Sequence, residues 1–284
     1  MIKYAHAIGN WSTMNWYDAA INGNIVSTPG DGDIADLNGY AITMDIATIP
    51  ASGTLLALRS PSKTGYLIVS LDAGAGLGNL AINAASITAG TRNGGFIAVS
   101  GTTYTLTINA GQITAGSASG AIAIDNTQAA HIIIVCANLW GGGGISSAYG
   151  LRNSSTGQID ITGNVRGGAG SNNFGLYNMS SGAININGNV LGSEYDKSAV
   201  GVFNNASGII TITGNLIYGT LSCPYNGYRP VLTLGSQYYY QMGSANIKFP
   251  QQLATSKVLK GTQHGDTIGT LSPDSPFRRL PLIT

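Results

Sequence analysis

An internal repeat constrains the fold of this chain more than any other feature of its sequence. Three segments align in register: Gly150-LRNSSTGQIDITGN-Val165, Gly175-LYNMSSGAININGN-Val190 and Gly201-VFNNASGIITITGN-Leu216. Their first residues lie about 25 and then about 26 residues apart. The register extends toward the N-terminus, because Ile132-IIVCAN-Leu139 matches the strand of the following copy and Ala81-INAASITA-Gly90 matches Thr107-INAGQITA-Gly116. We therefore expect at least about six coils between residues 80 and 219.

Alternating apolar residues within each copy indicate strands with one buried face. Isoleucines occupy every second position in Ile159-Asp160-Ile161, Ile184-Asn185-Ile186 and Ile210-Thr211-Ile212, which is the side-chain period of a β-strand. Two further aliphatic columns keep the same register: Leu151, Leu176 and Val202, and Val165, Val190 and Leu216. Three columns per coil predict three strands per turn, each paired with its copies about 4.8 Å above and below.

The predicted fold class is therefore all-β, a right-handed parallel β-helix (β-solenoid) with about 26 residues per coil and non-repetitive caps at both ends. The handedness follows from the length of the coils and from the general preference for right-handed parallel crossovers. The expected divisions are an N-terminal cap and attachment segment over residues 1–50, the solenoid over 51–219, and a C-terminal cap with an extended tail over 220–284.

The recurring Gly-Asn pairs are expected at corners between strands. Gly163-Asn164, Gly188-Asn189 and Gly214-Asn215 repeat at the coil period, and Asn138 is in the same register. Glycine and asparagine tolerate the positive φ angles that tight corners need. Stacked asparagines can also bond through their amides, so these positions predict an asparagine ladder. N-glycosylation is the competing interpretation, because Asn10, Asn153, Asn178 and Asn205 begin acceptor triplets.

Composition excludes several classes of partner. Only 9% of the 284 residues are charged, 43% are hydrophobic and 41 are Gly, whereas disorder combines low hydrophobicity with high net charge. The formal net charge is +1, and the largest basic cluster is the pair Arg278-Arg279, so we expect no nucleic-acid partner. The apolar run from Ile132 to Ala137 is far shorter than the roughly 20 residues of a membrane span. The opening residues lack a secretory-signal pattern, so we expect no membrane partner and synthesis in a cytoplasm.

The two ends carry a resemblance to known proteins. The opening GNWSTMNWYDAA…TPGDGDIADLNGYAITMD, with Trp11 and Trp16, resembles the N-terminal segment of many phage and bacterial surface proteins. The segment Pro250-QQLATSKVLKGTQHGDTIGTL-Ser272 is similar to C-terminal modules of phage virion proteins. Two residues depart from these patterns: Ile34 of the opening segment stands where Val is common, and His264 of the C-terminal segment replaces an aromatic residue. Together these segments cover about a quarter of the chain. The resemblance implies a bacteriophage virion structural protein of the tail-fibre, baseplate-spike or head-decoration kind.

The enzyme alternative is a tailspike-like polysaccharide depolymerase, either hydrolase or lyase. Glycoside hydrolysis usually needs two carboxylates about 5 to 9.5 Å apart. Asp160 has Asn185 and Thr211 at the equivalent outward positions, so it begins no carboxylate column. Glu194 and Asp196 lie in an insertion beside Lys197 and are expected to form a solvated loop. The sequence therefore predicts no enzymatic activity and no catalytic residue.

The remaining candidate groups also favour structural roles. The cluster Asp31, Asp33 and Asp36 lacks the distal Glu of a calcium loop and is expected to be a turn. His6, His131 and His264 are scattered, and counting by coil places His131 at the corner occupied by Gly157 and Gly182. Cys136 and Cys223 show no metal-binding spacing. The runs Gly74 to Gly78 and Gly141 to Gly144 lack the Lys-Ser/Thr of a phosphate loop. We therefore expect no cofactor and no metal.

We expect the chain to be a structural component of a virion, whose task is capping or adhesion to host surface glycans. A bacterial surface adhesin is a further alternative. The resemblance implies a homotrimer, since phage β-helical proteins similar to this one are commonly trimers. Recurring aromatics at Tyr149, Tyr177, Phe203 and Tyr218, followed by Tyr238 to Tyr240, are a second reason to expect a homo-oligomer. The proline-containing tail from Ser272 to Thr284 is expected to contact another chain and, with the N-terminal segment, other virion proteins.

Overall fold

The computed structural model describes residues 1–61, 63–73, 76–128, 130–143, 146–193, 199–206 and 208–214, together with the backbone of six short strands from β22 onward. The described residues form strands and turns and include no α-helix. Accordingly, none of their elements is a helix long and apolar enough to cross a membrane.

Two large sheets contain nearly all of the strands. Sheet A has fifteen strands: β1 (Ile2–Ala5), β3 (Trp16–Tyr17), β4 (Ile25–Val26), β5 (Ile34–Asp36), β7 (Thr48–Ile49), β8 (Ala57–Arg59), β10 (Leu80–Thr88), β12 (Thr105–Thr114), β14 (His131–Trp140), β16 (Ile159–Arg166), β18 (Ile184–Asn187), β19 (Val190–Leu191), β21 (Ile210–Ile212), β22 (Leu216–Ile217) and β25 (Ile247–Lys248). Sheet B has ten strands: β2 (Gly9–Asn10), β6 (Ala41–Thr43), β9 (Tyr66–Ser70), β11 (Gly94–Ser100), β13 (Ala121–Asn126), β15 (Tyr149–Asn153), β17 (Phe174–Asn178), β20 (Val202–Asn204), β23 (Leu232–Leu234) and β24 (Gln237–Tyr239). A separate hairpin joins β26 (Gln263–His264) to β27 (Thr267–Ile268).

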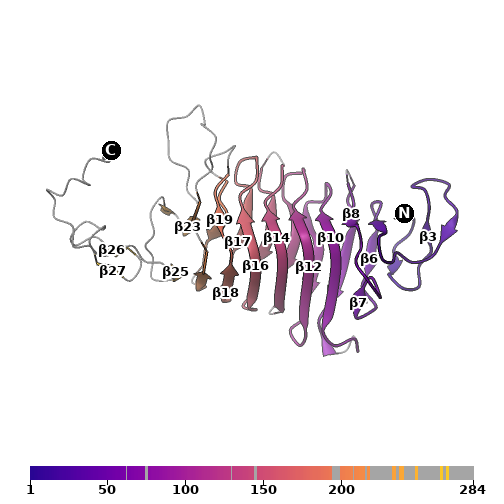
Figure 1. The fold of residues 1–284 in the computed structure, drawn as a ribbon, viewed down its shortest axis with the longest axis horizontal. Coiled ribbons are helices and arrows are strands. Elements are labelled where there is room, and N and C mark those ends of the chain that lie inside the picture. The colour runs from indigo at the N-terminus through magenta and orange to yellow at the C-terminus, as the bar shows by residue number, and fades with distance from the viewer. Residues whose placement is uncertain are drawn as a thin grey trace.

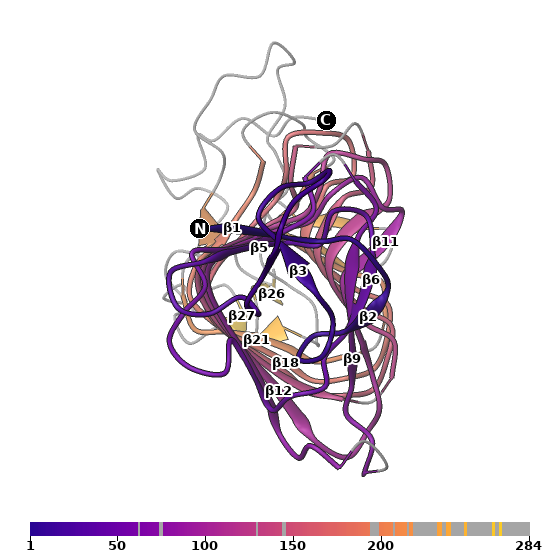
Figure 2. The same ribbon diagram turned by 90° about the vertical axis from the view of Figure 1, so that its right-hand side faces the viewer.

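The strands of each sheet follow one another along the long axis of the molecule, one coil beside the next (Figure 1). Seen along the stack, β12, β18 and β21 of sheet A lie on one side and β6, β9 and β11 of sheet B on the other (Figure 2). The chain alternates between the sheets, so consecutive strands of one sheet come from consecutive coils.

Parallel pairing places like residues side by side in the interior. The central column of sheet A runs through Ile82, Ile108, Ile134, Ile161, Ile186 and Ile212. The central column of sheet B runs through Leu67, Ile97, Ile124, Leu151, Leu176 and Val202. All twelve side chains are buried, and burying each aliphatic side chain contributes about 1.5–3 kcal/mol. The predicted all-β parallel β-solenoid is confirmed, with about six turns roughly 26 residues apart.

The described side chains of the three predicted apolar columns are buried, but the columns do not lie on three separate strands in every coil. β16 carries Ile161 of the first column and Val165 of the third, because this strand bends without a break. In the next coil the same stretch is divided between β18 and β19, and both pair with β16. Two faces of each coil therefore belong to sheet A, and the remaining face is sheet B.

A β-bulge alters the register of one coil. The register of the ladder between β14 and β16 shifts between Val135 and Asn138. β14 therefore has one residue more than β16 before the third apolar column, at Leu139. A bulge inserts one residue in one strand in this way. Because Ile132 pairs with Ile159, His131 lies at the level of Gln158 on the sheet face. The predicted alignment of His131 with the corner position of Gly157 and Gly182 is therefore wrong by one residue.

The parallel stack extends beyond the regular repeat at both ends. β1, β5 and β8 pair in parallel, as do β2, β6 and β9, so the first coils lie within residues 1–50. β3 and β4 add antiparallel strands at the outer edge of sheet A. Beyond residue 219, the backbones of β23 and β25 pair in parallel with β20 and β21. The tail from Ser272 to Thr284 lies outside the described residues.

The corner glycines are required by close packing of successive coils more than by positive φ. Of the three predicted corner glycines, Gly163 has a φ of 141°, whereas Gly188 and Gly214 are not among the positive-φ residues. A Cβ at Gly188 would lie 2.1 Å from the carbonyl oxygen of Gly163, and one at Gly214 would lie 2.1 Å from that of Gly188. The expectation of left-handed corners was therefore wrong at two of these positions, where the shared constraint is the distance between backbones.

The continuous asparagine ladder occupies a different column from the predicted one. Asn126, Asn153, Asn178 and Asn204 are buried in sheet B, and successive amides bond at 3.1, 3.0 and 2.8 Å. At the predicted Gly-Asn corners, Asn164 donates to Asn138 at 3.5 Å, and its oxygen accepts the backbone N–H of Asn189. Asn215 lies outside the described residues. A buried asparagine cannot accept a glycan in the folded chain, which excludes that interpretation for Asn153 and Asn178.

Candidate functional site

The outer face of sheet A carries a row of polar side chains centred on Asp160. His131 Nε2 lies 2.7 Å from Asp160 Oδ2, and Asn185 Nδ2 donates to Asp160 Oδ1 at 2.7 Å. Gln158 Nε2 donates to the same carboxylate at 2.8 Å, and Thr105 Oγ1 lies 3.5 Å from His131 Nδ1. These residues come from adjacent coils, so the parallel register itself brings them together.

The environment of Asp160 favours its ionised form. Partial burial would raise the pKa of Asp160, but the hydrogen bonds from Asn185, His131 and Gln158 outweigh it and lower the pKa. A general acid in glycoside hydrolysis needs the opposite shift. The side chains of His131 and Asp160 are 38% and 32% exposed, so both can contact a molecule that lies on this face.

The outer face of sheet B carries an aromatic patch, which we define as Tyr149, Phe174, Tyr177 and Phe203. The rings of Phe174 and Phe203 stack with centroids 4.7 Å apart, and those of Tyr149 and Tyr177 lie 4.9 Å apart. Burial raises the pKa of Tyr149. The sequence predicted three of these four aromatics as a recurring set, and the structure shows that they contact one another across neighbouring coils.

An ion pair lies next to the aromatic patch. Arg152 donates from Nε and Nη2 to the two oxygens of Asp125, at 2.9 and 2.7 Å. The hydrogen bond and charge of Asp125 raise the pKa of Arg152 despite partial burial of the guanidinium. Bidentate pairs of this kind have strong geometric specificity. The pair therefore holds Arg152 in a fixed position on the sheet.

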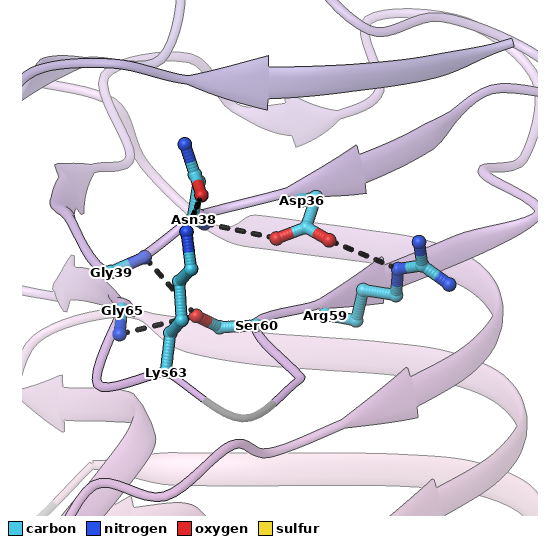
Figure 3. Close-up of polar contacts among 7 residues, drawn as sticks. All are labelled: Asp36, Asn38, Gly39, Arg59, Ser60, Lys63 and Gly65. Carbon is cyan, nitrogen blue, oxygen red and sulfur yellow. Dashed lines mark hydrogen bonds and ion pairs between the residues drawn. The ribbon is translucent and has the colours of Figure 1, made fainter. Parts of the chain in front are cut away.

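A second polar cluster joins the N-terminal coils (Figure 3). Asp36 accepts hydrogen bonds from Arg59 Nε at 3.2 Å and from the backbone N–H of Asn38 at 3.0 Å. Lys63 Nζ donates to Asn38 Oδ1, while Asn38 Nδ2 donates to the carbonyl oxygens of Ala5 and Ala20. Burial raises the pKa of Asp36 in spite of these partners. Since its bonds reach three separate segments, the cluster fastens the start of the chain to the solenoid.

The predicted turn role of the N-terminal aspartates is consistent with their contacts. Asp31 accepts the backbone N–H of Thr54, and Asp33 accepts that of Gly30 and pairs with Lys3 at 2.7 Å. Asp36 belongs to the separate cluster around Arg59. Within the described residues, no group of three or more His, Cys, Asp or Glu side chains is placed to hold a metal ion.

The other candidates are distributed as follows. His6 stacks on Tyr17 and bonds to the carbonyl of Ala19. Cys136 is a free thiol, and burial raises its pKa to about 11, which makes it a poor nucleophile. Cys223, Glu194, Asp196 and the side chain of His264 lie outside the described residues.

The contact between His131 and Asp160 was not foreseen. Sequence order indicated no Ser/His/Asp constellation, yet Thr105, His131 and Asp160 form one row across three coils. The one signal that could have revealed it is the pairing of Ile132 with Ile159, which sets His131 beside Asp160.

No protein-family model, no curated protein and no solved structure matches the chain.

Proposed function

We propose that this chain is a structural component of a bacteriophage particle, such as a tail fibre, baseplate spike or capsid decoration, with adhesion to host surface glycans as an associated task. The fold supports this proposal because a stack of coils paired through their backbones makes a stiff, elongated body. Such a body can separate an attachment end from a contact surface. The same proposal locates the chain in the virion and gives it no catalytic activity.

The apolar surface of the N-terminal segment is the observation that carries the proposal. Ile8, Ile21 and Ile25 are 76%, 77% and 63% exposed, whereas Trp11 and Trp16 of the same segment are fully buried. Exposed apolar groups of this size on a rigid frame indicate a protein partner. Ile25 also lies on β4, the terminal strand of sheet A, and such edges can pair with a strand from another chain. We therefore assign attachment to this segment.

Phage assembled with variant chains supplied in trans tests the attachment. Ile21→Lys combined with Ile25→Lys should reduce the amount of the chain in purified particles at least tenfold, since charge would prevent apolar docking. Ile209→Lys is the matched control, because Ile209 is an exposed isoleucine on the solenoid. Both purified variants should unfold at the wild-type temperature. Normal incorporation of the double variant, or equal loss with the control, would contradict this role.

The depolymerase remains a second candidate because His131 and Asp160 form a partly exposed pair of proton-transfer groups. Incubation with capsular polysaccharide and lipopolysaccharide of the host should release no oligosaccharide if the chain is structural. Release that disappears in Asp160→Asn would establish an enzyme at this row. Release that survives Asp160→Asn but disappears in Glu194→Gln or Asp196→Asn would assign the activity to those residues.

Homotrimeric assembly, with the tail from Ser272 to Thr284 lying across another chain, completes the proposal. Arg278 and Arg279 can form bidentate pairs with carboxylates of that chain. Deletion of the tail should leave the circular dichroism of the solenoid unchanged and abolish incorporation into particles. A deletion variant that is incorporated normally, or a full-length chain that sediments as a monomer, would refute this part.

A further inference from the structure

The aromatic patch places four rings from neighbouring coils in mutual contact beside hydrogen-bonding groups. Tyr149, Tyr177 and Phe203 are partly exposed, and Phe174 is buried between them. Phe174 stacks on Tyr149 and on Phe203, with interplanar angles of 13° and 12°. Tyr177 stands edge-on to Phe203 at 5.4 Å. The rings therefore form one preformed surface across β15, β17 and β20.

Arg152 and Asp125 provide donors and acceptors at the side of this surface without net charge. Arg152 pairs with Tyr177 in the ladder between β15 and β17, so the guanidinium and the ring occupy neighbouring outward positions. The side chain of Arg152 is 32% exposed, and its pair with Asp125 uses Nε and Nη2. Among the described residues, Nη1 is left without an acceptor and can donate to a bound molecule.

We propose that this patch binds a neutral pyranose unit of a host surface glycan, an inference that rests on the adhesion task proposed above. The C–H face of a sugar ring is apolar and packs on an aromatic ring, while its hydroxyl groups need nearby donors and acceptors. Aromatic rings beside a few fixed polar groups are the usual composition of a small-molecule site. The neutral Arg152–Asp125 pair complements hydroxyl groups better than it complements a phosphate or a carboxylate.

A second copy of the chain is a less suitable occupant. A stable protein interface buries about 800 Å² on each partner and centres on strongly exposed apolar groups. None of the four rings is among the strongly exposed large apolar residues of the described chain, in contrast to Ile8, Ile21 and Ile25. The apolar area that the rings leave open therefore suits a sugar ring more than a protein surface.

Saturation-transfer NMR with the full-length chain tests the proposal. The probes are the methyl pyranosides of glucose, galactose, mannose and N-acetylglucosamine, with methyl glucuronide as the charged comparison. We expect at least one neutral probe to bind through its C–H face, and Tyr177→Leu to weaken that binding at least tenfold. Tyr66→Leu is the matched control, because Tyr66 is another partly exposed tyrosine of sheet B and lies under Arg92. Thermal unfolding should show both variants folded.

Three results would overturn the inference: no saturation transfer from the protein to any neutral probe, equal binding by wild type and Tyr177→Leu, or preference for the glucuronide. Loss of the oligomer in Tyr177→Leu during sedimentation would identify a second copy as the occupant. Incorporation into particles is measured on the same variant and should be normal. If sugar binding fails while incorporation persists, only this site is wrong; if the wild-type chain is absent from particles, the proposed function is wrong whether or not sugars bind.

Discussion

At the scale of single residues, the amides inside sheet B have a large influence on stability. Asn178 accepts a hydrogen bond from Asn153 and donates to Asn204, and all three side chains are buried. Each such bond contributes about 1 kcal/mol, and a buried amide group left without its partner costs about 1–3 kcal/mol. The ladder therefore stabilises the stack only while each member is present.

Replacement of Asn178 by Leu should lower the free energy of unfolding by about 2–4 kcal/mol, because it leaves an amide hydrogen of Asn153 and the oxygen of Asn204 unpaired. Urea unfolding followed by circular dichroism measures the change. Asn205→Ala is the control, since Asn205 is exposed and a surface change should stay within about 0.5 kcal/mol. Equal unfolding midpoints for Asn178→Leu and wild type would contradict the structural role of the ladder.

Asp33 should make stability depend on pH. Burial would raise the pKa of Asp33, but its bonds to Lys3 and to the N–H of Gly30 lower it from 3.8 to about 2. The unfolded chain therefore binds the proton more readily, so the stabilisation is full above pH 3.8 and is lost as pH falls through about 2. Urea unfolding from pH 2 to 7 should show Asp33→Asn less stable than wild type by about 2 kcal/mol at pH 7, with the difference decreasing toward acid.

Asp36 should affect the pH dependence of stability in the opposite direction from Asp33. Its pKa is raised, so its ionisation weakens the fold and protonation at low pH strengthens it. Asp36→Asn should therefore not show the loss expected for Asp33→Asn at neutral pH. A difference between wild type and Asp33→Asn that stays constant across the range would show that Lys3 does not hold the Asp33 carboxylate.

The ladder was partly predictable from the repeat. Asn153, Asn178 and Asn204 recur two residues after the buried Leu151, Leu176 and Val202, and a period of two places both positions on the inner face. The Gly-Asn corners were predicted to hold the ladder because glycine and asparagine tolerate positive φ, yet that tolerance does not decide which amides face each other. The row of Thr105, His131 and Asp160 was harder to predict, since a one-residue bulge displaces the simple count.

At the scale of strands, contact between backbones at the corners sets how closely the coils stack. A Cβ on Gly188 would overlap the carbonyl oxygen of Gly163, whereas one on Gly143 would meet nothing within 4 Å. Gly188→Ala should therefore lower the free energy of unfolding by about 3 kcal/mol or more. The backbones of Gly188 and Gly163 cannot move apart without breaking the strand pairing on their other sides. Gly143→Ala should change stability by less than about 0.5 kcal/mol.

Thermal and urea unfolding of these two variants side by side measures the effect of corner packing. Similar midpoints for Gly188→Ala and Gly143→Ala would show that the coils can separate locally to admit a methyl group. The contrast is informative because both changes add the same group to a glycine. Only the distance to the adjacent coil differs.

Periodicity predicted which strands exist and which faces they bury, because each copy repeats the same alternation of apolar and polar residues. It could not predict that β10, β12, β14 and β16 each run around a corner as one bent strand, while β18 and β19 are separate. The bulge in β14 is likewise a local choice that leaves the apolar pattern almost unchanged.

At the scale of the whole molecule, the stack of coils is an elongated shaft that carries the proposed attachment segment at its N-terminal end and the proposed sugar-binding patch on sheet B. The parallel stack starts within residues 1–50, so the proposed attachment segment is continuous with the shaft. A force applied at Ile21 or Ile25 would pass directly into the paired strands of sheet A. The aromatic patch lies many coils away, on β15, β17 and β20 of sheet B.

Quantitative mass spectrometry of purified, intact phage particles tests the central proposal most directly. We predict that the chain copurifies with the particles through a density gradient, at a constant copy number that is a multiple of three. Antibody labelling in electron microscopy should then place it on one substructure of the particle. A chain that is absent from particles and is found in the medium or on the surface of uninfected bacteria would contradict the proposal and favour a bacterial adhesin.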